Sequence, residues 1–587
     1  MIFNNVYFYP TNTISWDVFG YYLYLPLTFI SDGSPTEQLQ YLDHIISTYD
    51  STETLYQIQP LDEGGFVLKY TSGWAVCYAP FFFFGHLFAN ITSHPADGFS
   101  LPYQIAVFSG SIFYSLIGIY FLLKIALAFF KPKISVLIVL LIIFGTNYLF
   151  HNTMYGQNAM THNLLFTGYT IIIWLTIKWY REPKLKTIMY LGLVCGLVIL
   201  TRPTEIVCLL IPLLWPIPGE LNRIEFFKDK LKQLVIFSII LIAVGSIQLI
   251  YWKSTTGKLL FLDYGNPAEG LDFLSPHTIE VLFSFRKGWF VYTPLMALAT
   301  LGFLVLYRKN KRLFIPLFIF FITNLYLVSS WSVWWYASSF SQRALIPSMA
   351  VMIVPLGYLL IYIFNKRFLE KLIMSLLISG MVILNVFQTI QFYLGVIPGD
   401  RMTKAYYFAT FGSLVPNDSL KNELLLIDRN HIEDVDFTDS SKYSKSLLYH
   451  NTFSKEPGAV AHPDETGKYA FKLSKDTIYT PPFKIAYKDL TDRDHAFIRI
   501  RAKVFKTGED PENPTLLTAS FDYNGAVYKW ENISLEAVPA GKWSEIELIY
   551  LTPEVRSLED KLTVQFWHRQ EHPIYVDEIK VEAFSPK

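Results

Sequence analysis

The stretch ALIPSMAVMIVPLGYLLIYIF, residues 344–364, has 21 residues and no charged side chain. A helix of this length can cross the apolar core of a bilayer, which takes about 20 residues. A basic loop follows at Lys366, Arg367 and Lys371. The whole chain of 587 residues is 52% hydrophobic and only 17% charged, with a mean hydropathy of +0.30. This composition excludes an ordinary soluble protein.

Similar apolar runs recur along the middle of the chain. They lie near 103–130, 134–150, 160–179, 233–252, 290–307, 313–330 and 372–394. The run 187–217 is interrupted by Arg202, Pro203 and Glu205, which indicates two short spans that meet at a polar turn. We therefore predict a multi-pass α-helical membrane domain of about ten spans over residues 103–394.

Basic residues fall in every second loop between these runs. The five basic loops lie near 131–133, 178–186, 223–232, 308–312 and 366–371. Because cytoplasmic loops carry the excess of Lys and Arg, these loops are predicted to face the cytoplasm from an inner, cytoplasmic membrane. The alternate loops and the region after 394 are then extracytoplasmic.

Residues 1–102 are predicted to form the first extracytoplasmic loop. The run 73–90 is short and contains Pro80, Gly85 and His86, which favours an interfacial or re-entrant helix over a span. A loop at the start of the chain needs an anchor that carries it across. We therefore expect that a first transmembrane helix precedes Met1 and is absent from this chain.

The C-terminal part follows a different pattern. Residues 395–455 are polar and irregular and indicate a connector. Residues 456–587 alternate apolar and polar side chains in short runs between turn residues, which predicts an all-β sandwich of jelly-roll type. This part contains no cysteine, so no disulfide holds it together.

Several partners and cofactors are not indicated. The formal net charge is zero, so we expect no nucleic-acid partner. No Walker loop and no glycine-rich dinucleotide motif is present, and no His or Cys spacing indicates a metal site. No cofactor is predicted, although a divalent metal stays open.

Asp17 lies in the aromatic stretch ISWDVFGYYLYLP, residues 14–26. A carboxylate between Trp and Tyr beside a membrane domain costs free energy unless water solvates it or a cation pairs with it, and otherwise it indicates a functional role. At the mouth of an extracytoplasmic cavity Asp17 would be a candidate general base. A turn or helix-cap role is the alternative.

Cations at the outer boundary of a membrane run against the positive-inside bias, and an anionic ligand such as a lipid phosphate would explain them. The candidates for phosphate binding are Arg202, Arg286, Lys287 and Arg343. For Arg202 the alternative is an ion pair with Glu205. For Arg286 and Lys287 it is interfacial snorkelling, and for Arg343 it is a cap over the preceding tryptophans.

Other polar and aromatic residues of the predicted outer face form a candidate substrate pocket. They are Tyr21, Tyr70, His151, His162, Glu205, Trp334, Trp335 and Tyr336. Neutral hydrogen-bonded histidines and an aromatic interface belt are the alternatives. Planar aromatic side chains can also stack on sugar rings or cover a polyprenyl chain.

Residues 1–394 resemble the GT-C superfamily of membrane glycosyltransferases, which includes protein-mannosyltransferase-like and aminoarabinose-transferase-like groups. The shared features are the early Asp17, a segment with Tyr70, Gly73, Pro80 and Phe81, the TRPT segment at 201–204 and the WWYxxSFxxR segment at 334–343. The sandwich resembles carbohydrate-binding jelly rolls through 541–548 and 575–581, and a structural or docking module is the alternative.

The resemblance implies an inverting transfer of a sugar from a polyprenyl-phosphate donor to an extracytoplasmic glycan, lipid or protein acceptor. Asp17 would deprotonate the acceptor hydroxyl, and the four cations would neutralise the leaving phosphate. Many family members have a second acidic residue in an outer loop, for which Asp32, Asp62 and Glu63 are equal candidates here. A non-catalytic lipid-glycan transporter, or a scaffold that presents a glycan-binding domain, is the competing hypothesis.

Overall fold

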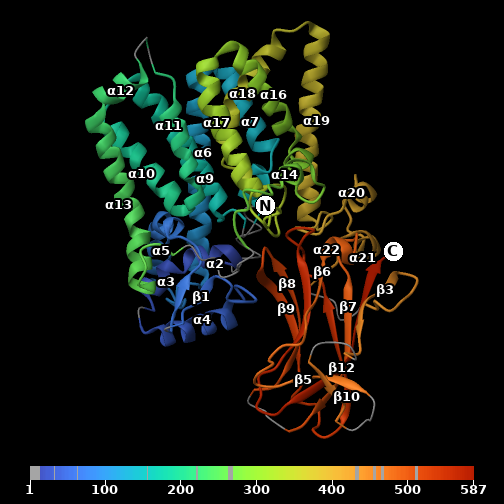
Figure 1. Ribbon diagram of the computed structural model, residues 1–587. Coiled ribbons are helices and arrows are strands. Elements are labelled where there is room, and N and C mark those ends of the chain that lie inside the picture. Colours follow the sequence, from blue (N-terminus) through green and yellow to red (C-terminus); the bar gives the residue numbers. More distant parts are fainter. Residues whose placement is uncertain are drawn as a thin grey trace. The chain divides into compact units, whose positions relative to one another are not determined.

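A computed structural model describes residues 13–31, 33–62, 64–154, 157–217, 219, 222–261, 269–429, 435–453, 458–463, 468–508 and 513–587. The chain forms two compact units (Figure 1). The first, here the helical unit, comprises Met1–Gly265 and Leu271–Leu424. The second, the β unit, comprises Asn266–Gly270 and Leu425–Lys587.

Within the described residues of the helical unit, five helices are long and apolar enough to cross a membrane. They are α5 Gly73–Ile91, α6 Leu101–Phe129, α13 Leu231–Thr256, α17 Lys311–Ser329 and α19 Phe368–Tyr393. The other helices of the bundle are α7 Pro132–Phe144, α8 Tyr148–Thr153, α9 Thr161–Arg181, α10 Leu185–Thr201, α11 Leu210–Leu214, α12 Arg223–Asp229, α14 Thr278–Phe283, α15 Trp289–Tyr292, α16 Pro294–Lys309 and α18 Met349–Phe364. A helical region able to enter a membrane is therefore confirmed.

The helix break predicted at Arg202 is present. Helix α10 ends at Thr201, and Arg202 adopts an extended backbone with φ −153° and ψ 114°. A proline disfavours the helical conformation of the residue before it, and it lacks an N–H group. The chain resumes at Pro203 as the 3-10 helix η1, Pro203–Leu209, which leads into α11.

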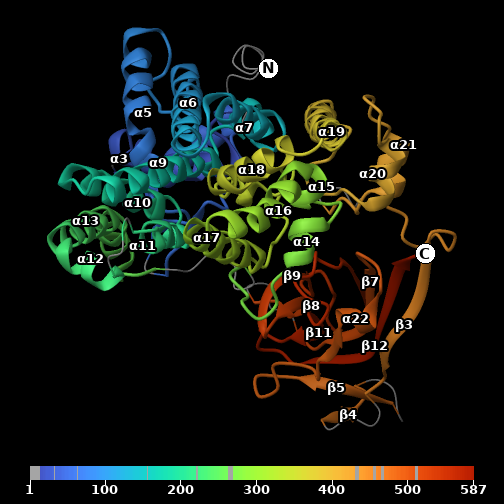
Figure 2. The same cartoon turned by 90° about the horizontal axis from the view of Figure 1, so that it is seen from above.

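Helix α5 differs in part from its prediction. It is one continuous helix through Pro80, and its length and composition suit a span, whereas the sequence favoured an interfacial or re-entrant helix. Its residue Gly85 lies against Tyr103 of α6, and the Tyr114 hydroxyl donates to the Cys77 carbonyl at 2.6 Å, so the two helices run antiparallel. Helices α13 and α19 stand upright in Figure 1, whereas α5 is seen along its length in Figure 2, which views the molecule from above. Helix α5 therefore runs across the direction of α13 and α19.

The first loop folds against these helices. It contains α2 Trp16–Tyr22, α3 Tyr24–Phe29, α4 Pro35–Tyr49 and the hairpin of β1 Ile58–Pro60 with β2 Phe66–Leu68. Helix α4 begins with a capping box, in which the Ser34 hydroxyl accepts from the Glu37 N–H and the Glu37 carboxylate accepts from the Ser34 N–H. The loop shares a core with α5, α6 and α9, in which Tyr22 and Phe99 pack with Trp74 of α5.

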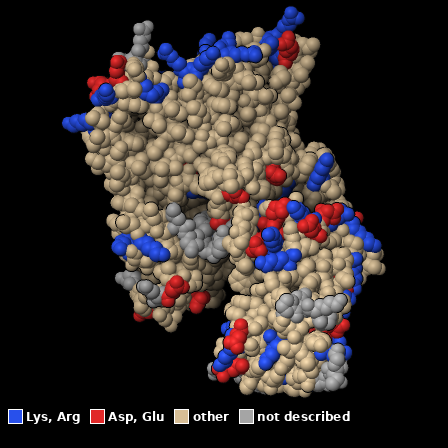
Figure 3. Space-filling model, in the orientation of Figure 1, with Lys and Arg blue, Asp and Glu red and all other residues tan. Residues whose placement is uncertain are grey.

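Most of the Lys and Arg side chains visible on the helical unit gather at one end, here the basic end (Figure 3). The connections from α6 to α7, α9 to α10, α11 to α13, α16 to α17 and α18 to α19 lie at this end (Figure 1), and they are the five basic loops of the sequence. Helices α2 and α3 lie at the other end.

The β unit contains two antiparallel sheets. One has the order β10-β7-β12-β5-β4, with β3 also paired to β12, and the other has the order β6-β11-β8-β9. The strands are β3 Tyr443–Asn451, β4 Ala459–Ala461, β5 Tyr469–Leu473, β6 Phe483–Ala486, β7 Phe497–Lys506, β8 Leu516–Tyr523, β9 Ala526–Ser534, β10 Trp543–Leu551, β11 Lys561–Trp567 and β12 Ile574–Pro586. Both sheets contribute to one core, with Ile500 and Val576 from the first and Leu517 and Phe566 from the second.

The predicted C-terminal β region is therefore present. Strand β3 belongs to it, although it lies within the stretch 395–455 that the sequence indicated as a connector. The same stretch holds α20 Lys404–Thr410 and α21 Asp418–Leu424 of the helical unit, while the short helix α22 Tyr487–Leu490 lies between β6 and β7.

Candidate functional site

Asp17 lies in the first turn of α2, at the end of the helical unit opposite the basic end. The helix begins at Trp16, whose φ of 51° is unusual for a residue with a side chain. The Asp17 side chain is 21% exposed. The turn therefore holds the carboxylate at the inner side of the first loop, with limited access to water.

Three side chains surround the Asp17 carboxylate. The hydroxyls of Tyr56 and Tyr70 both donate to Oδ1 at 2.8 Å, and Arg343 Nη2 donates to Oδ2 at 3.2 Å. Burial raises the pKa of Asp17, but the charge of Arg343 and the two tyrosine hydrogen bonds outweigh burial and hold this pKa below its ordinary value. The carboxylate is therefore ionised at neutral pH.

Arg343 begins the 3-10 helix η2, Arg343–Leu345, and is 8% exposed. Its Nε is buried and has no hydrogen-bond partner among the described residues. A buried, unsatisfied N–H of a cation is costly. Arg343 therefore has one donor in use on Asp17 and another, Nε, without an acceptor in the described structure.

The loop before Arg343 has a strained backbone. Tyr336, Ala337 and Ser341 have φ values of 53°, 53° and 56°. Left-handed conformations of residues with side chains cost of order 1 kcal/mol or more, and they persist only where the surroundings hold them. Lys287 and Arg286, two of the predicted phosphate ligands, keep the loop in this conformation.

Lys287 is the first of them. It is 1% exposed, and its ammonium donates to the carbonyls of Ser339 and Gly399 and to the Ser339 hydroxyl at 3.1 Å. These three acceptors match the three protons of the ammonium group. In this structure Lys287 holds the loop rather than presenting a donor to a ligand.

Arg286 braces the same loop from the neighbouring position. Its guanidinium lies over the Trp335 ring at 4.3 Å and donates to the Asp400 carbonyl. A cation over an indole face is an attractive contact. Trp334 lies 5.8 Å from Trp335, and the Tyr336 hydroxyl donates to the Val328 carbonyl at 3.2 Å. These aromatic residues contribute to the loop that carries Arg343.

Arg202 forms a second cluster. Its Nη2 donates to the Thr161 hydroxyl at 3.0 Å and lies 3.5 Å from His162 Nδ1, and its Nη1 lies 3.5 Å from Glu205 Oε1. Glu205 also accepts from the Tyr169 hydroxyl at 2.6 Å. The ion pair that was the alternative for Arg202 is therefore present, although the contact is long.

Tyr21 connects the two clusters. Its ring lies 4.5 Å from that of Tyr70. Burial and then the charge of Asp17 raise the pKa of Tyr21 to about 12, while the charges of Arg202 and Arg343 act in the opposite direction. The charges of Asp17, Arg202 and Arg343 therefore all influence the pKa of the Tyr21 hydroxyl.

The two histidines lie beside these clusters. His151 Nε2 lies 3.2 Å from the Phe340 carbonyl, and burial lowers the pKa of His151 to about 3, so the ring is neutral and donates. The rings of His151 and His162 are 6.4 Å apart. Among the residues that the structure describes, no group of three or more His, Cys, Asp or Glu side chains could hold a metal ion.

Sequence reasoning missed Tyr56. It lies 39 residues from Asp17, and only the fold of the first loop brings its hydroxyl to the carboxylate. No local pattern marks it. Of the candidates for a second acid, Asp62 is exposed, while Asp32 and Glu63 lie outside the described residues.

The site thus combines an ionised carboxylate, two phenol donors and two arginines. Such a set can accept a proton at Asp17 and bind an anion at Arg343 or Arg202. Comparison with known proteins finds no matching family model and no matching curated protein.

Proposed function

We propose that the protein is an integral-membrane glycosyltransferase that moves a sugar from a polyprenyl-phosphate donor to an extracytoplasmic acceptor. The observation that supports this proposal best is the contact of Asp17 with Arg343, at the end of the helical unit opposite the basic loops. A proton acceptor and an anion-binding cation side by side suit the transfer of a group away from a phosphate.

The proposed topology places the basic end in the cytoplasm. Helices α6, α7, α9, α10, α13, α16, α17, α18 and α19, together with η1 and α11 as one short span, then make ten passes through an inner membrane. Helix α5 would lie at the outer interface, where its exposed residues Phe83, Phe84, Leu87 and Phe88 would meet lipid.

In the proposed reaction, the acceptor hydroxyl oxygen attacks the anomeric carbon on the face opposite the phosphate. The bond from carbon to the phosphate oxygen breaks, and polyprenyl phosphate leaves with the electron pair. Asp17 takes the proton of the acceptor hydroxyl, and Arg343 and Arg202 stabilise the negative charge on the leaving group. Lys287 and Arg286 would act by holding the loop that carries Arg343.

The ion pair implies that binding of the donor comes before activation of Asp17. While Arg343 contacts Asp17, the carboxylate has a lowered pKa and is a weak base. A donor phosphate that engages Arg343, through the buried Nε or in place of Asp17, would weaken that contact and raise the basicity of Asp17. Binding of the donor would then activate the base.

The β unit is proposed to bind glycan. Its edge strand β9 carries Trp530, which is 60% exposed, and an exposed indole face suits stacking on a sugar ring. The jelly-roll resemblance of the sandwich supports the same role.

The test is transfer of radiolabelled sugar from a panel of polyprenyl-phosphate sugars by the purified full chain in neutral detergent. Asp17→Asn keeps the size of the side chain but removes the base, and we expect at least a 100-fold loss of rate. Asp43→Asn is the matched control, because Asp43 is an exposed acid of the same loop and has no predicted role in the site.

Equal rates for wild type and Asp17→Asn would remove Asp17 from the mechanism. Specific binding of the lipid donor without transfer from any member of the panel would instead favour the non-catalytic transporter or scaffold.

A further inference from the structure

A pocket of about 300 Å³ opens at the basic end of the helical unit, far along the chain from Asp17. Four segments line it: the last turn of α6, the last turn of α9, the residues after α11 and the first turn of α17. Its volume lies at the lower limit of ligand pockets, which measure roughly 300–1,000 Å³. The site proposed for sugar transfer does not use it.

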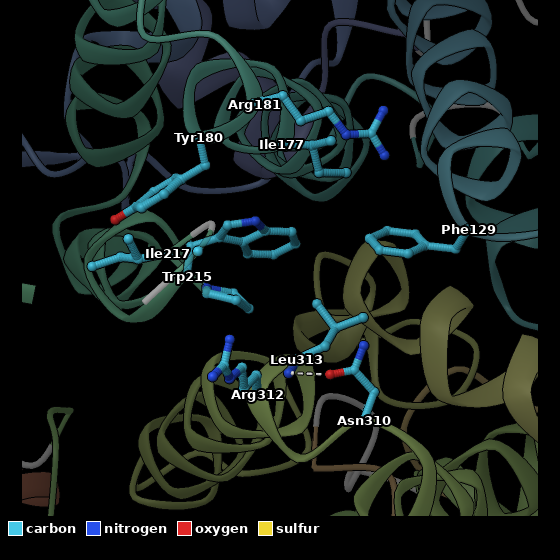
Figure 4. A pocket seen from close by; sticks show the side chains of 11 residues that line it. Phe129, Ile177, Tyr180, Arg181, Trp215, Ile217, Asn310, Arg312 and Leu313 are labelled. Carbon is cyan, nitrogen blue, oxygen red and sulfur yellow. Dashed lines mark hydrogen bonds between the residues drawn. The ribbon is translucent and has the colours of Figure 1, made fainter. Parts of the chain in front are cut away.

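The pocket has an apolar lining and two cations. Figure 4 shows Trp215 and Phe129 facing each other across the opening, with Arg181 on one side and Arg312 on the opposite side. Among the described residues that line it, none is acidic. The nearest acid to Arg181 in sequence, Glu182, pairs with Lys184 at 2.6 Å. Both arginines are exposed and lie on opposite sides of the opening, and the described lining supplies no counter-charge to either.

The two arginines differ from a third at the same end. Arg223 donates to the carbonyls of Leu213, Leu214 and Trp215 and so caps the end of α11. Arg181 gives one long contact, at 3.3 Å, to the Ala128 carbonyl. Arg312 has no hydrogen bond or ion pair within the described part of the chain. Arg181 and Arg312 are exposed, and most of their donors are not used by the described part of the chain.

The wall of the pocket is held in place without a ligand. The Tyr180 hydroxyl donates to the Pro212 carbonyl at 2.7 Å, and its ring stacks on Phe226 at 5.4 Å. On the other side, Asn310 Oδ1 accepts from the Leu313 N–H at 3.1 Å, the one hydrogen bond drawn in Figure 4. A wall that is already ordered lowers the entropic cost of binding.

We propose that this pocket binds the phosphate headgroup of an anionic membrane lipid at the cytoplasmic face. Arg181 and Arg312 at the opening attract the phosphate, and Phe129, Trp215 and Leu313 contact the glycerol and the start of the acyl chains. Guanidinium groups suit phosphate oxygens because their paired N–H groups match them. Basic pockets between membrane helices on the cytoplasmic side are a recognised form of headgroup site.

The test measures lipid binding to the purified full chain in neutral detergent by native mass spectrometry. The probes are phosphatidylglycerol, phosphatidylcholine with the same acyl chains, and glycerol phosphate. The variant is Arg181→Gln with Arg312→Gln. The matched control is Arg367→Gln, an exposed arginine of the same end that does not line the pocket.

We expect phosphatidylglycerol to bind at least tenfold more tightly than phosphatidylcholine. The double variant should lose at least tenfold in affinity, while Arg367→Gln should bind as wild type. Arg312→Gln alone, which breaks no described contact, serves if the double variant does not fold and should lose at least threefold.

Three results would overturn the proposal. They are equal binding of the two lipids, wild-type binding by the variants, and saturation by glycerol phosphate at the same concentration as the lipid, since the acyl chains would then contribute nothing.

Discussion

Asp17 and Arg343 lie 326 positions apart in the sequence, and their side chains form an ion pair at 3.2 Å. The first belongs to α2 in the first loop and the second to the start of η2, after the strained loop 336–341. The pair therefore joins two distant parts of the helical unit and is the central contact of the candidate site.

Removing one partner of this pair should destabilise the helical unit. We expect Arg343→Gln to lower the free energy of unfolding by about 2 kcal/mol, since breaking a fully buried pair costs roughly 3–5 kcal/mol and Asp17 keeps some contact with water. Thermal unfolding in detergent measures the change, with the exposed Arg308→Gln as control. The double variant Asp17→Asn with Arg343→Gln should lose less than the sum of the single losses; strictly additive losses would contradict a direct pair.

Acid should remove the stability that Asp17 contributes. Its folded-state pKa lies below the unfolded value, so this contribution is complete above about pH 4 and is lost as the pH falls through the folded pKa. Melting temperatures between pH 7 and pH 3 should fall less steeply for Asp17→Asn than for wild type. Parallel curves for the two proteins would show that the pKa of Asp17 is not lowered by folding.

The phenols of Tyr56 and Tyr70 should tune Asp17. Each Tyr→Phe variant removes a hydrogen bond to the carboxylate, which we expect to cost about 1 kcal/mol of stability and to raise the pKa of Asp17. The acidic limb of the pH–rate profile for sugar transfer should move to higher pH. Tyr120→Phe, on the exposed face of α6, is the control. An unmoved limb in both variants would mean that Asp17 does not govern it.

Lys287 should act through the loop rather than through a substrate. Lys287→Gln leaves the carbonyls of Ser339 and Gly399 without their shared donor. We expect backbone hydrogen exchange over 331–343 to rise at least tenfold, together with a loss of transfer activity, while the exposed Lys258→Gln changes neither. Loss of activity with unchanged exchange would instead indicate direct contact of Lys287 with the donor.

The topology predicts which face of the membrane each end occupies. In a background without Cys77, Cys195 and Cys208, Ser47→Cys in the first loop should react with an impermeant maleimide in intact cells. Lys232→Cys at the basic end should react only after permeabilisation. Protection of position 47 in intact cells would contradict the proposed outer face.

Local properties of the sequence were enough for the helices, the β region and the grouping of the basic loops. Length and hydropathy decide whether a segment can cross a bilayer, and 344–364 or 372–394 can be recognised without knowing their neighbours. The break at Arg202 follows from Pro203 alone. Helix α5 was harder, because a run of 18 residues with a proline suits either an interfacial helix or a span.

The roles of the four cations could not be predicted from local properties of the sequence. Arg202, Arg286, Lys287 and Arg343 look alike in the sequence, as four cations on one predicted face. Packing separates them: Lys287 is saturated by backbone carbonyls, Arg286 covers Trp335, and Arg343 reaches Asp17. Hydropathy and loop charge depend on neighbouring residues and are therefore visible in the sequence. Which donor meets which acceptor depends on the folding of segments more than 300 residues apart, and only the tertiary structure decides it.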